Sequence, residues 1–244
     1  MAARPKKNQN QSLLFDMEVK EERWMEPGFH RQGFRSIIGV DEAGRGPLAG
    51  PVVASAVILR PDAVLPELDD SKRLTAAKRD ALFDQVRKQA LAVGVGVACA
   101  ADIDRLNILQ ATFHSMRLAI TQVRRLLSKP ADLILLDGKL KFDYDIPIQA
   151  IVKGDHRCKS IAAASIIAKV TRDRIMEAYD DLYPQYGLAG HKGYPTEKHR
   201  EAIREFGPTP LHRLSFRGVL PEEEEAPSEE ASQETLQLDL TSKS

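Results

Sequence analysis

Four carboxylates follow short apolar segments of the chain, at the point where each segment ends: Asp41, Glu42, Asp137 and Asp155. A carboxylate is costly inside a protein core unless it is paired or bound to a metal ion. Ligands of open α/β sheets collect just beyond the strand ends, so we expect these side chains to meet there. Four carboxylates form an all-oxygen site suited to Mg²⁺ or Mn²⁺. Because two such ions can clamp the attacking and leaving oxygens of a phosphodiester, the pattern predicts phosphodiester chemistry.

The carboxylates have a simpler interpretation, as helix caps or turn residues. For Asp41, Asp137 or Asp155 alone that interpretation is the commoner outcome, whereas all three at strand ends favour a site. Asp41 and Glu42 pose a geometric problem, because adjacent residues of a strand point to opposite faces. We therefore expect the strand to break directly after them, in the turn 43–47, whose glycines permit unusual backbone angles.

The same turn contains Gly44, Arg45 and Gly46, and it could bring backbone N–H and C=O groups against a ligand. It is not a nucleotide-binding fingerprint, because no G-x-G-x-x-G runs through it and no G-K-[ST] follows. A tight turn without a ligand is the alternative. Only its position next to Asp41 and Glu42 favours a site.

Hydrophobic periodicity indicates which elements position these residues. It predicts strands over five ranges: 36–40, 52–59, 91–98, 132–136 and 146–152. It predicts helices over four: 75–90, 107–127, 160–183 and 196–206, the last ended by Gly207 and Pro208. Thr75 can cap the first helix, with Ala81, Leu82 and Val86 facing inward. Strands followed by alternating helices and strands indicate an α/β fold with a mixed sheet.

Composition divides the 244 residues into three parts. Residues 1–30 show little periodicity and are expected to be a flexible N-terminal segment. Residues 221–244, rich in Glu, Ser and Pro, are expected to be a disordered acidic tail. Residues 31–220 are the predicted catalytic domain, with 29 basic and 22 acidic side chains and a net charge of +7. A basic body suits a polyanionic partner, with a merely soluble surface as an equal alternative.

The sequence has no feature of an exported or membrane protein. No apolar run approaches the roughly 20 residues that span a bilayer, and residues 1–11 lack the apolar core of a secretory signal. Cys99 and Cys158 have no metal-ligand spacing and form no disulfide framework. We therefore expect a cytoplasmic monomer that binds no membrane.

The carboxylate-bearing turn is part of a longer pattern. Residues 38–53, IGVDEAGRGPLAGPVV, resemble the signature of bacterial ribonuclease HII, in the type 2 ribonuclease H family. Five more segments follow in the family's order: 68–74, 137–138, 153–173, 193–196 and 212–216. The resemblance covers about residues 35–218, and six segments in order are not expected by chance.

The resemblance implies a ribonuclease H-like fold, with a mixed five-stranded sheet flanked by helices and a C-terminal helical extension. It implies that two Mg²⁺ or Mn²⁺ ions bind, with the substrate, to Asp41, Glu42, Asp137 and Asp155. It also implies substrate contacts. Gly44, Arg45 and Gly46 would contact the 2′-hydroxyl of the ribonucleotide before the cut. Tyr194 would pack against the sugar that follows. The phosphate contacts would be Lys72, Ser160 and Lys169.

The implied substrates are RNA–DNA hybrids and duplex DNA with a single ribonucleotide, cut to leave 5′-phosphate and 3′-hydroxyl ends. Another two-metal nuclease or polynucleotidyl transferase on the same fold would have the carboxylates but not the glycine-arginine-glycine turn or Tyr194. A binding module without activity would lack at least one carboxylate, and all four are present.

Several residues keep plainer alternatives. Without the resemblance, Tyr194 would be interpreted as the anchor of a turn before a helix. The histidines show no metal spacing. His191 and His199, near Tyr194, are expected to be exposed polar residues, with a contact to the substrate as the alternative. His156 directly follows Asp155, which only weakly indicates a role in handling water or protons.

Two short segments resemble the pentapeptides that bind bacterial sliding clamps: Gln11–Phe15 and Gln237–Leu240. Both lie in predicted disorder, where a short apolar motif can order on a partner. Patterns of this length often arise by chance, so a clamp is only a candidate partner. The acidic tail could instead serve to keep the protein soluble.

Overall fold

The computed structural model describes residues 23–68 and 74–220 of the chain. Its strands form one sheet in the order β3-β2-β1-β4-β5. Their bounds are β1 (Ile37–Ala43), β2 (Val52–Leu59), β3 (Ala90–Ala98), β4 (Leu133–Asp137) and β5 (Ile148–Ile151). The central strand β1 pairs antiparallel with β2 and parallel with β4, so the sheet is mixed, as predicted.

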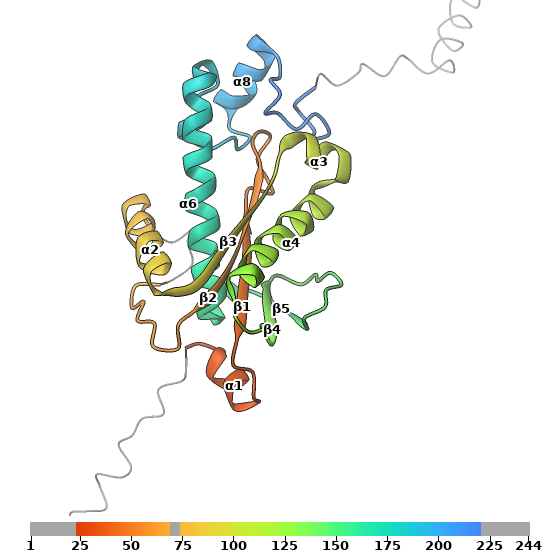
Figure 1. The fold of residues 1–244 in the computed structure, drawn as a ribbon. Coiled ribbons are helices and arrows are strands. Elements are labelled where there is room, and N and C mark those ends of the chain that lie inside the picture. The colour runs from red at the N-terminus through yellow and green to blue at the C-terminus, as the bar shows by residue number, and fades with distance from the viewer. Residues whose placement is uncertain (1–22, 69–73, 221–244) are drawn as a thin grey trace, which may run out of the picture.

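Helices cover both faces of this sheet (Figure 1). Their bounds are α1 (Glu26–Arg31), α2 (Ala76–Gln89), α3 (Ala100–Leu106), α4 (Ile108–Leu126), α5 (Gly154–Arg157), α6 (Lys159–Leu182), α7 (Leu188–His191) and α8 (Glu197–Phe206), with a 3₁₀ turn, η2, at Pro184–Tyr186. The long helix α6 packs on β1 and β2 with α2 beside it, and α4 packs on β2 and β3 from the other face. The predicted mixed sheet flanked by helices is confirmed.

Alternation along β1 decides which helix meets which residue. Ile38 and Val40 point into the core beneath α4. Gly39 faces α6, and a Cβ at this position would collide with the backbone of Ser160. The glycine therefore lets α6 lie directly on the sheet, which brings side chains of α6 close to the far end of β1.

Side-chain caps set several helix starts. Thr75 accepts the backbone N–H of Lys78 at the start of α2, and Thr196 accepts that of His199 at the start of α8. Asn107 caps α4 through two backbone N–H groups, with a positive φ of 65°. These three helices begin where the sequence predicts because their caps are local.

One predicted core contact is wrong. Ala81 on α2 is exposed, whereas Phe83 joins Leu82 and Val86 on the buried face. Phe83 offers far more apolar surface than an alanine, so its burial sets the rotation of the helix. The short helix α3 was not predicted, because seven residues carry little periodicity.

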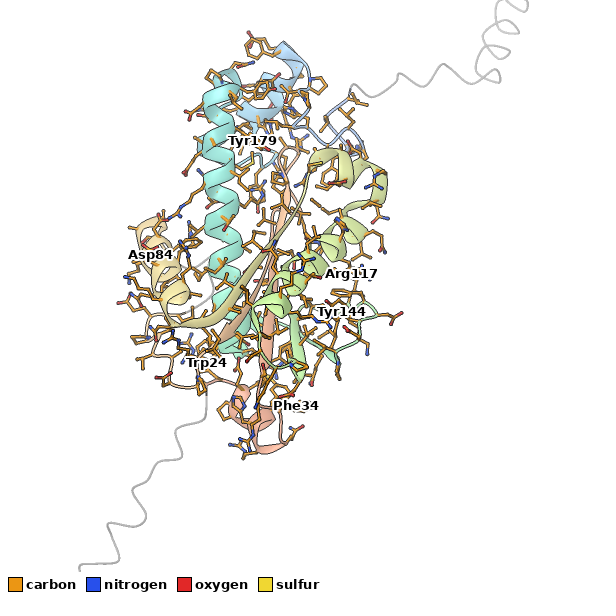
Figure 2. The ribbon with its side chains drawn as sticks, in the orientation of Figure 1. Trp24, Phe34, Asp84, Arg117, Tyr144 and Tyr179 are labelled. Carbon is orange, nitrogen blue, oxygen red and sulfur yellow. The ribbon has the colours of Figure 1, made fainter. Side chains whose placement is uncertain are left out.

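The chain beyond α6 forms the helical extension. Its elements η2, α7 and α8 enclose a small core that includes Leu48 and Ala49 of the loop between β1 and β2. Tyr179 lies at this end of the molecule, and Trp24 and Phe34 lie at the other, beside α1 (Figure 2). The predicted boundary between residues 30 and 31 falls inside α1. In the described ranges, no helix combines the length and apolarity needed to cross a membrane.

Candidate active site

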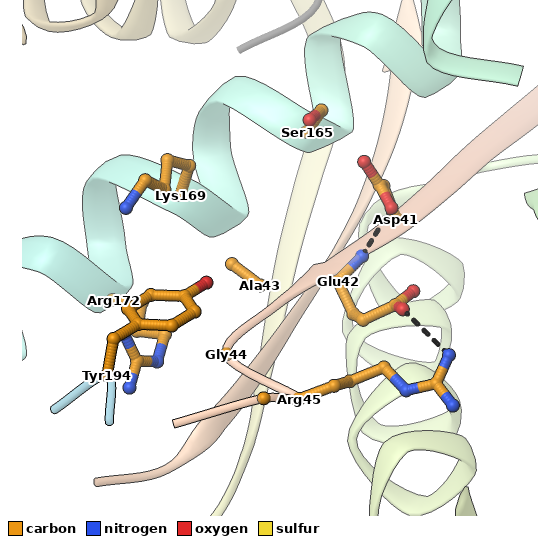
Figure 3. A pocket seen from close by; sticks show the side chains of 10 residues that line it. Asp41, Glu42, Ala43, Gly44, Arg45, Ser165, Lys169, Arg172 and Tyr194 are labelled. Carbon is orange, nitrogen blue, oxygen red and sulfur yellow. Dashed lines mark hydrogen bonds and ion pairs between the residues drawn. The ribbon is translucent and has the colours of Figure 1, made fainter. Parts of the chain in front are cut away.

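Asp41 and Glu42 belong to β1 itself. The strand continues to Ala43, with Asp41 opposite Ser55 and Glu42 opposite Ala54 of β2. The expected break comes at Gly44, which has a positive φ of 96° and lies inside the predicted turn 43–47. It falls one residue later than expected, because pairing with β2 keeps the chain extended through Ala43. The two side chains leave the strand in different directions, and the Glu42 N–H donates to Asp41 Oδ1 at 2.7 Å (Figure 3).

The Asp41 carboxyl group is buried, at 6% exposure. Burial raises its pKa well above the ordinary value, and the charges of Glu42 and Asp137 raise it further. A hydrogen bond with Ser165 on α6 acts in the opposite direction. A carboxyl group in this position favours a proton or a metal cation as its partner.

Asp137 and Asp155 approach from the neighbouring strands. Asp137 ends β4, as predicted, and its Oδ1 accepts the backbone N–H of Gly154 at 2.6 Å. Asp155 follows that glycine in the first turn of α5 and is buried, at 6% exposure. The structure thus brings Asp137 within electrostatic reach of Asp41, and one hydrogen bond ties the segment that carries Asp155 to Asp137.

The donor chemistry suits a divalent cation. Among the described residues, no three or more His, Cys, Asp or Glu side chains are already arranged to hold a metal ion. The carboxylates are nevertheless hard oxygen donors, and their mutual repulsion raises the pKa of Asp41. A cation among Asp41, Glu42 and Asp137, with Asp155 beside them, would offset that repulsion.

Two buried arginines hold the loop that follows β1: Arg172 of α6 and Arg213 near the C-terminal end of the described chain. Gly44 adopts a positive φ of 96°, and a Cβ there would collide with the Arg172 side chain. Glycine is therefore required at this position, both for the backbone angle and for the close approach of the arginine.

The two guanidinium groups donate to the backbone carbonyls of Gly44, Arg45, Ala49, Gly50, Pro51 and Lys192. Burial lowers the pKa of Arg213 to about 9 and also lowers that of Arg172. Carbonyl acceptors compensate these buried donors and fix the orientation of each peptide unit. The loop therefore has a defined backbone conformation before any ligand binds.

The carboxylates and the loop share one cavity of about 220 Å³ (Figure 3). Its lining residues are Asp41, Glu42, Ala43, Gly44, Arg45, Gly46, Ser165, Lys169, Arg172 and Tyr194. Tyr194 is 44% exposed, and its ring centroid lies 6.0 Å from the Arg172 guanidinium carbon. Arg45 Nη1 lies 3.4 Å from Glu42 Oε1, and Lys169 Nζ lies 2.7 Å from Asp173 Oδ1.

One implied phosphate contact, Ser160, does not line this cavity. Ser160 lines a second cavity with Trp24 and Lys159, and its N–H and Oγ donate to Glu26 Oε1 at 2.8 and 2.9 Å. Lys72 lies outside the described residues, as do both clamp-like segments.

The expectation that His191 and His199 are exposed is wrong, because His199 is buried and His191 is partly buried. His199 and His212 are buried, and their Nε2 atoms lie 3.2 Å apart. The His191 ring stacks on His199, with centroids 4.4 Å apart. The reason lies in α8, where His199, Ala202 and Ile203 share the inner face at helical spacing.

Ser165, Arg172 and Arg213 were missed as parts of the site. Ser165, Lys169 and Arg172 have the spacing i, i+4 and i+7, which places them on one face of α6 and was an available signal. Arg213 gave no local signal, because 163 residues separate it from Gly50, one of its acceptors.

Comparisons with known proteins agree with this geometry. The family model described as Ribonuclease HII matches residues 38–219. Three curated relatives carry the same description. That of Syntrophotalea carbinolica is 52% identical, over 84% of this chain and 97% of its own. The relative from Geobacter sulfurreducens is 55% identical, over 84% of this chain and 94% of its own. That of Geobacillus kaustophilus is 52% identical, over 82% and 76%.

Solved structures show the same fold. Ribonuclease H2 from Pyrococcus horikoshii has a TM-score of 0.62 and 26% identity, over 76% of this chain and 95% of that one. Bst-RNase HIII in complex with Mn²⁺ has a TM-score of 0.61 and 21% identity, over 78% and 70%. RNase HII in the PCNA complex from Archaeoglobus fulgidus has a TM-score of 0.61 and 23% identity, over 78% of this chain and 98% of that one. With relatives more than half identical along most of its length, the chain belongs to the ribonuclease HII family of metal-dependent endoribonucleases.

Proposed function

We propose that this enzyme cuts the RNA strand of RNA–DNA hybrids and also cuts duplex DNA on the 5′ side of a single embedded ribonucleotide. The products carry 5′-phosphate and 3′-hydroxyl ends. The observation that supports this is the meeting of two unlike parts in one cavity, the carboxylates of Asp41 and Glu42 and the backbone loop Gly44–Gly46. The first part suits phosphodiester hydrolysis, and the second suits recognition of a ribose.

The carboxylates provide the metal-binding half. Two Mg²⁺ or Mn²⁺ ions on Asp41, Glu42, Asp137 and Asp155 would supply an activated water and stabilise the departing 3′ oxygen. The chain itself gathers carboxyl groups at the ends of β1 and β4, where burial and the charges of Glu42 and Asp137 raise the pKa of Asp41. A relative of the same fold has been solved with Mn²⁺.

The loop provides the selective half. Arg213 donates to the carbonyls of Gly44 and Arg45, and Arg172 donates to that of Ala49 farther along the same loop. Little reorganisation is therefore needed when a 2′-hydroxyl arrives. A site built to bond a hydroxyl rejects the analogue that lacks it, because its polar groups then lose a partner. Tyr194 packs against the sugar that follows, and Lys169 contacts a phosphate.

Cleavage of three labelled duplexes by the full chain tests this proposal, in Mg²⁺ and in Mn²⁺. One is all DNA, one carries a single ribonucleotide, and one is an RNA–DNA hybrid. We expect cuts in the second and third duplexes only. A ligase should be able to reseal the cut, because the products carry the 5′-phosphate and 3′-hydroxyl ends that ligation requires. Equal cutting of the all-DNA duplex would instead identify another two-metal nuclease on the same fold.

We also propose a sliding clamp as partner, through Gln11–Phe15 or Gln237–Leu240, which lie outside the described residues. A solved relative of the same fold is described as a complex with PCNA. Binding of purified clamp to the monomeric full chain should weaken when Phe15 and Leu240 are both changed to alanine. If the variant binds the clamp as well as the wild type does, or if neither protein binds it, the proposal of a clamp partner through these segments is wrong.

A further inference from the structure

Three histidine rings lie beneath the backbone of Tyr194. His199 and His212 are buried, and the His191 ring stacks on that of His199 at a centroid distance of 4.4 Å and an interplanar angle of 22°. His199 Nδ1 lies 3.0 Å from the Tyr194 carbonyl oxygen, and His199 Nε2 lies 3.2 Å from His212 Nε2. His212 Nδ1 lies 2.9 Å from the backbone nitrogen of Thr209.

The two ends of this chain of contacts determine where the protons lie. The Thr209 N–H can only donate, so His212 Nδ1 accepts and His212 carries its proton on Nε2. His212 Nε2–H donates a hydrogen bond to His199 Nε2, so the proton of His199 is on Nδ1. The Tyr194 carbonyl can only accept, and it accepts the hydrogen bond from His199 Nδ1–H. Every partner is satisfied when both rings are neutral, so each ring has one tautomer.

The surroundings keep the rings neutral. Burial lowers the pKa of His199 to about 4 and also lowers that of His212. The titratable groups that face His199 are the other two histidines, His191 from α7 and His212 from the C-terminal segment. His191 Nδ1 accepts the Gly193 N–H, so its Nε2 donates to the Tyr186 carbonyl. His191 therefore holds the turn before Tyr194 through two hydrogen bonds to backbone groups.

The turn that carries Tyr194 is also fixed from its other side. Arg172 donates to the Lys192 carbonyl, and the Leu48 N–H donates to the Gly193 carbonyl. A Cβ added to Gly46 would lie 3.8 Å from the Tyr194 ring, so the ring stands directly beside the loop that follows β1. Any shift of the Tyr194 backbone would therefore move the ring relative to that loop.

We propose that His199 is a positioning residue for Tyr194, held in the Nδ1–H tautomer by His212 and Thr209 so that it anchors the Tyr194 carbonyl. This inference rests on the proposed function, in which the Tyr194 ring packs against the sugar that follows the ribonucleotide. His199 touches no substrate and acts only through the tyrosine. Its loss should therefore lower cleavage only while the Tyr194 ring is present.

Two substitutions separate the two hydrogen bonds of His199. In His199→Asn the side-chain amide can take the place of Nδ1 and still donate to the Tyr194 carbonyl. In His199→Gln the amide reaches the place of Nε2, towards His212, and the Tyr194 carbonyl keeps only the backbone N–H of Thr196 as its donor. Cleavage of a single-ribonucleotide duplex is measured for both variants and for His114→Gln, a control on the exposed face of α4.

We expect kcat/KM near the wild-type value for His199→Asn and for His114→Gln. We expect it to be about 5- to 10-fold lower for His199→Gln, as for the loss of one hydrogen bond. In a Tyr194→Ala background, His199→Gln should cause no further loss, since the two residues act as one unit. Equal rates for His199→Asn and His199→Gln, or a full additional loss in the Tyr194→Ala background, would overturn the proposal.

Nitrogen-15 NMR of the histidine rings in the wild-type chain gives a second readout that needs no variant to fold. The proposal requires a protonated Nδ1 and an unprotonated Nε2 on His199 at neutral pH, and the opposite tautomer would refute it. Wild-type cleavage distinguishes the two levels of the account. A wild type that cuts no ribonucleotide-containing duplex removes the proposed function and this inference with it, whereas an active wild type with the wrong tautomer removes the inference alone.

Discussion

The cavity has two walls that are built in opposite ways. The carboxylate wall, formed by Asp41 and Glu42, stands at the end of β1. Burial, and then the charges of Glu42 and of nearby Asp137, raise the pKa of Asp41. The ribose wall, formed by the loop Gly44–Gly46 and by Tyr194, stands on loops whose carbonyls accept hydrogen bonds from buried donors. In the proposed function a cation completes the first wall, whereas hydrogen bonds already fix the backbone of the second. Changes to the first should abolish cutting, and changes to the second should weaken selection.

The largest effect is expected at the carboxylate wall. Asp41→Asn should lower the cleavage rate by at least about 1,000-fold, because metal-assisted charge stabilisation is lost. Asp84→Asn, on the exposed face of α2, is a matched control that should cut at the wild-type rate (Figure 2). Near-normal turnover by Asp41→Asn would remove the carboxylate wall from the mechanism.

The same substitution should stabilise the metal-free protein. The folded-state pKa of Asp41 is raised, so its ionisation at neutral pH opposes folding, and asparagine carries no charge to bury. We expect a higher melting temperature for Asp41→Asn than for the wild type in a buffer with a chelator. A lower melting temperature would show that the carboxylate is compensated without a cation.

Loss of the aromatic ring should come next in size. Tyr194→Ala should lower kcat/KM on a single-ribonucleotide duplex by about 10- to 100-fold, as for a lost aromatic packing contact. Because the side chain is 44% exposed, the melting temperature should barely change. Tyr194→Phe keeps the ring and should keep the rate. An unchanged rate in Tyr194→Ala would return this residue to a structural role in its turn.

Removing an arginine beneath the ribose wall should affect stability and selection together. Arg213→Met leaves the carbonyls of Gly44, Arg45 and Gly50 without their donor, which costs about 3 kcal/mol of unfolding free energy. Discrimination between ribonucleotide-containing and all-DNA duplexes should fall about 10-fold. Arg204→Met removes only an exposed ion pair and should change neither. Full selectivity in a destabilised Arg213→Met would separate the arginine from recognition.

The smallest effect concerns pH. The pKa of His199 is lowered by burial from 6.5 to about 4, so the unfolded chain takes up this proton first as the pH falls. The contribution to stability is complete above about pH 6.5 and is lost as the pH falls towards 4. Urea unfolding at pH 7 and pH 5 should therefore show a smaller decrease for His199→Asn than for the wild type. The same decrease in both would assign the pH dependence to other groups.

The same contrast explains what the sequence could predict. Val52–Leu59 is a continuous apolar run, so β2 could be predicted to the residue. The end of β1 could not be, because only pairing with β2 keeps Asp41, Glu42 and Ala43 extended. The four carboxylates could be singled out as candidates because Asp41 and Glu42 lie near the end of β1, Asp137 ends β4, and Asp155 follows β5. The supports of the ribose wall, Arg213 and His199, come from distant segments, and only the folded chain shows their acceptors.

The central claim is that one wall cuts and the other selects. It is tested most directly by measuring the affinity of Asp41→Asn for two otherwise identical duplexes in Mg²⁺, one all DNA and one with a single ribonucleotide. We expect the variant to cut neither duplex yet to bind the ribonucleotide-containing one more tightly, by about the same factor as the wild type. Loss of this preference together with loss of cutting would contradict the claim, because selection would then depend on the carboxylate wall.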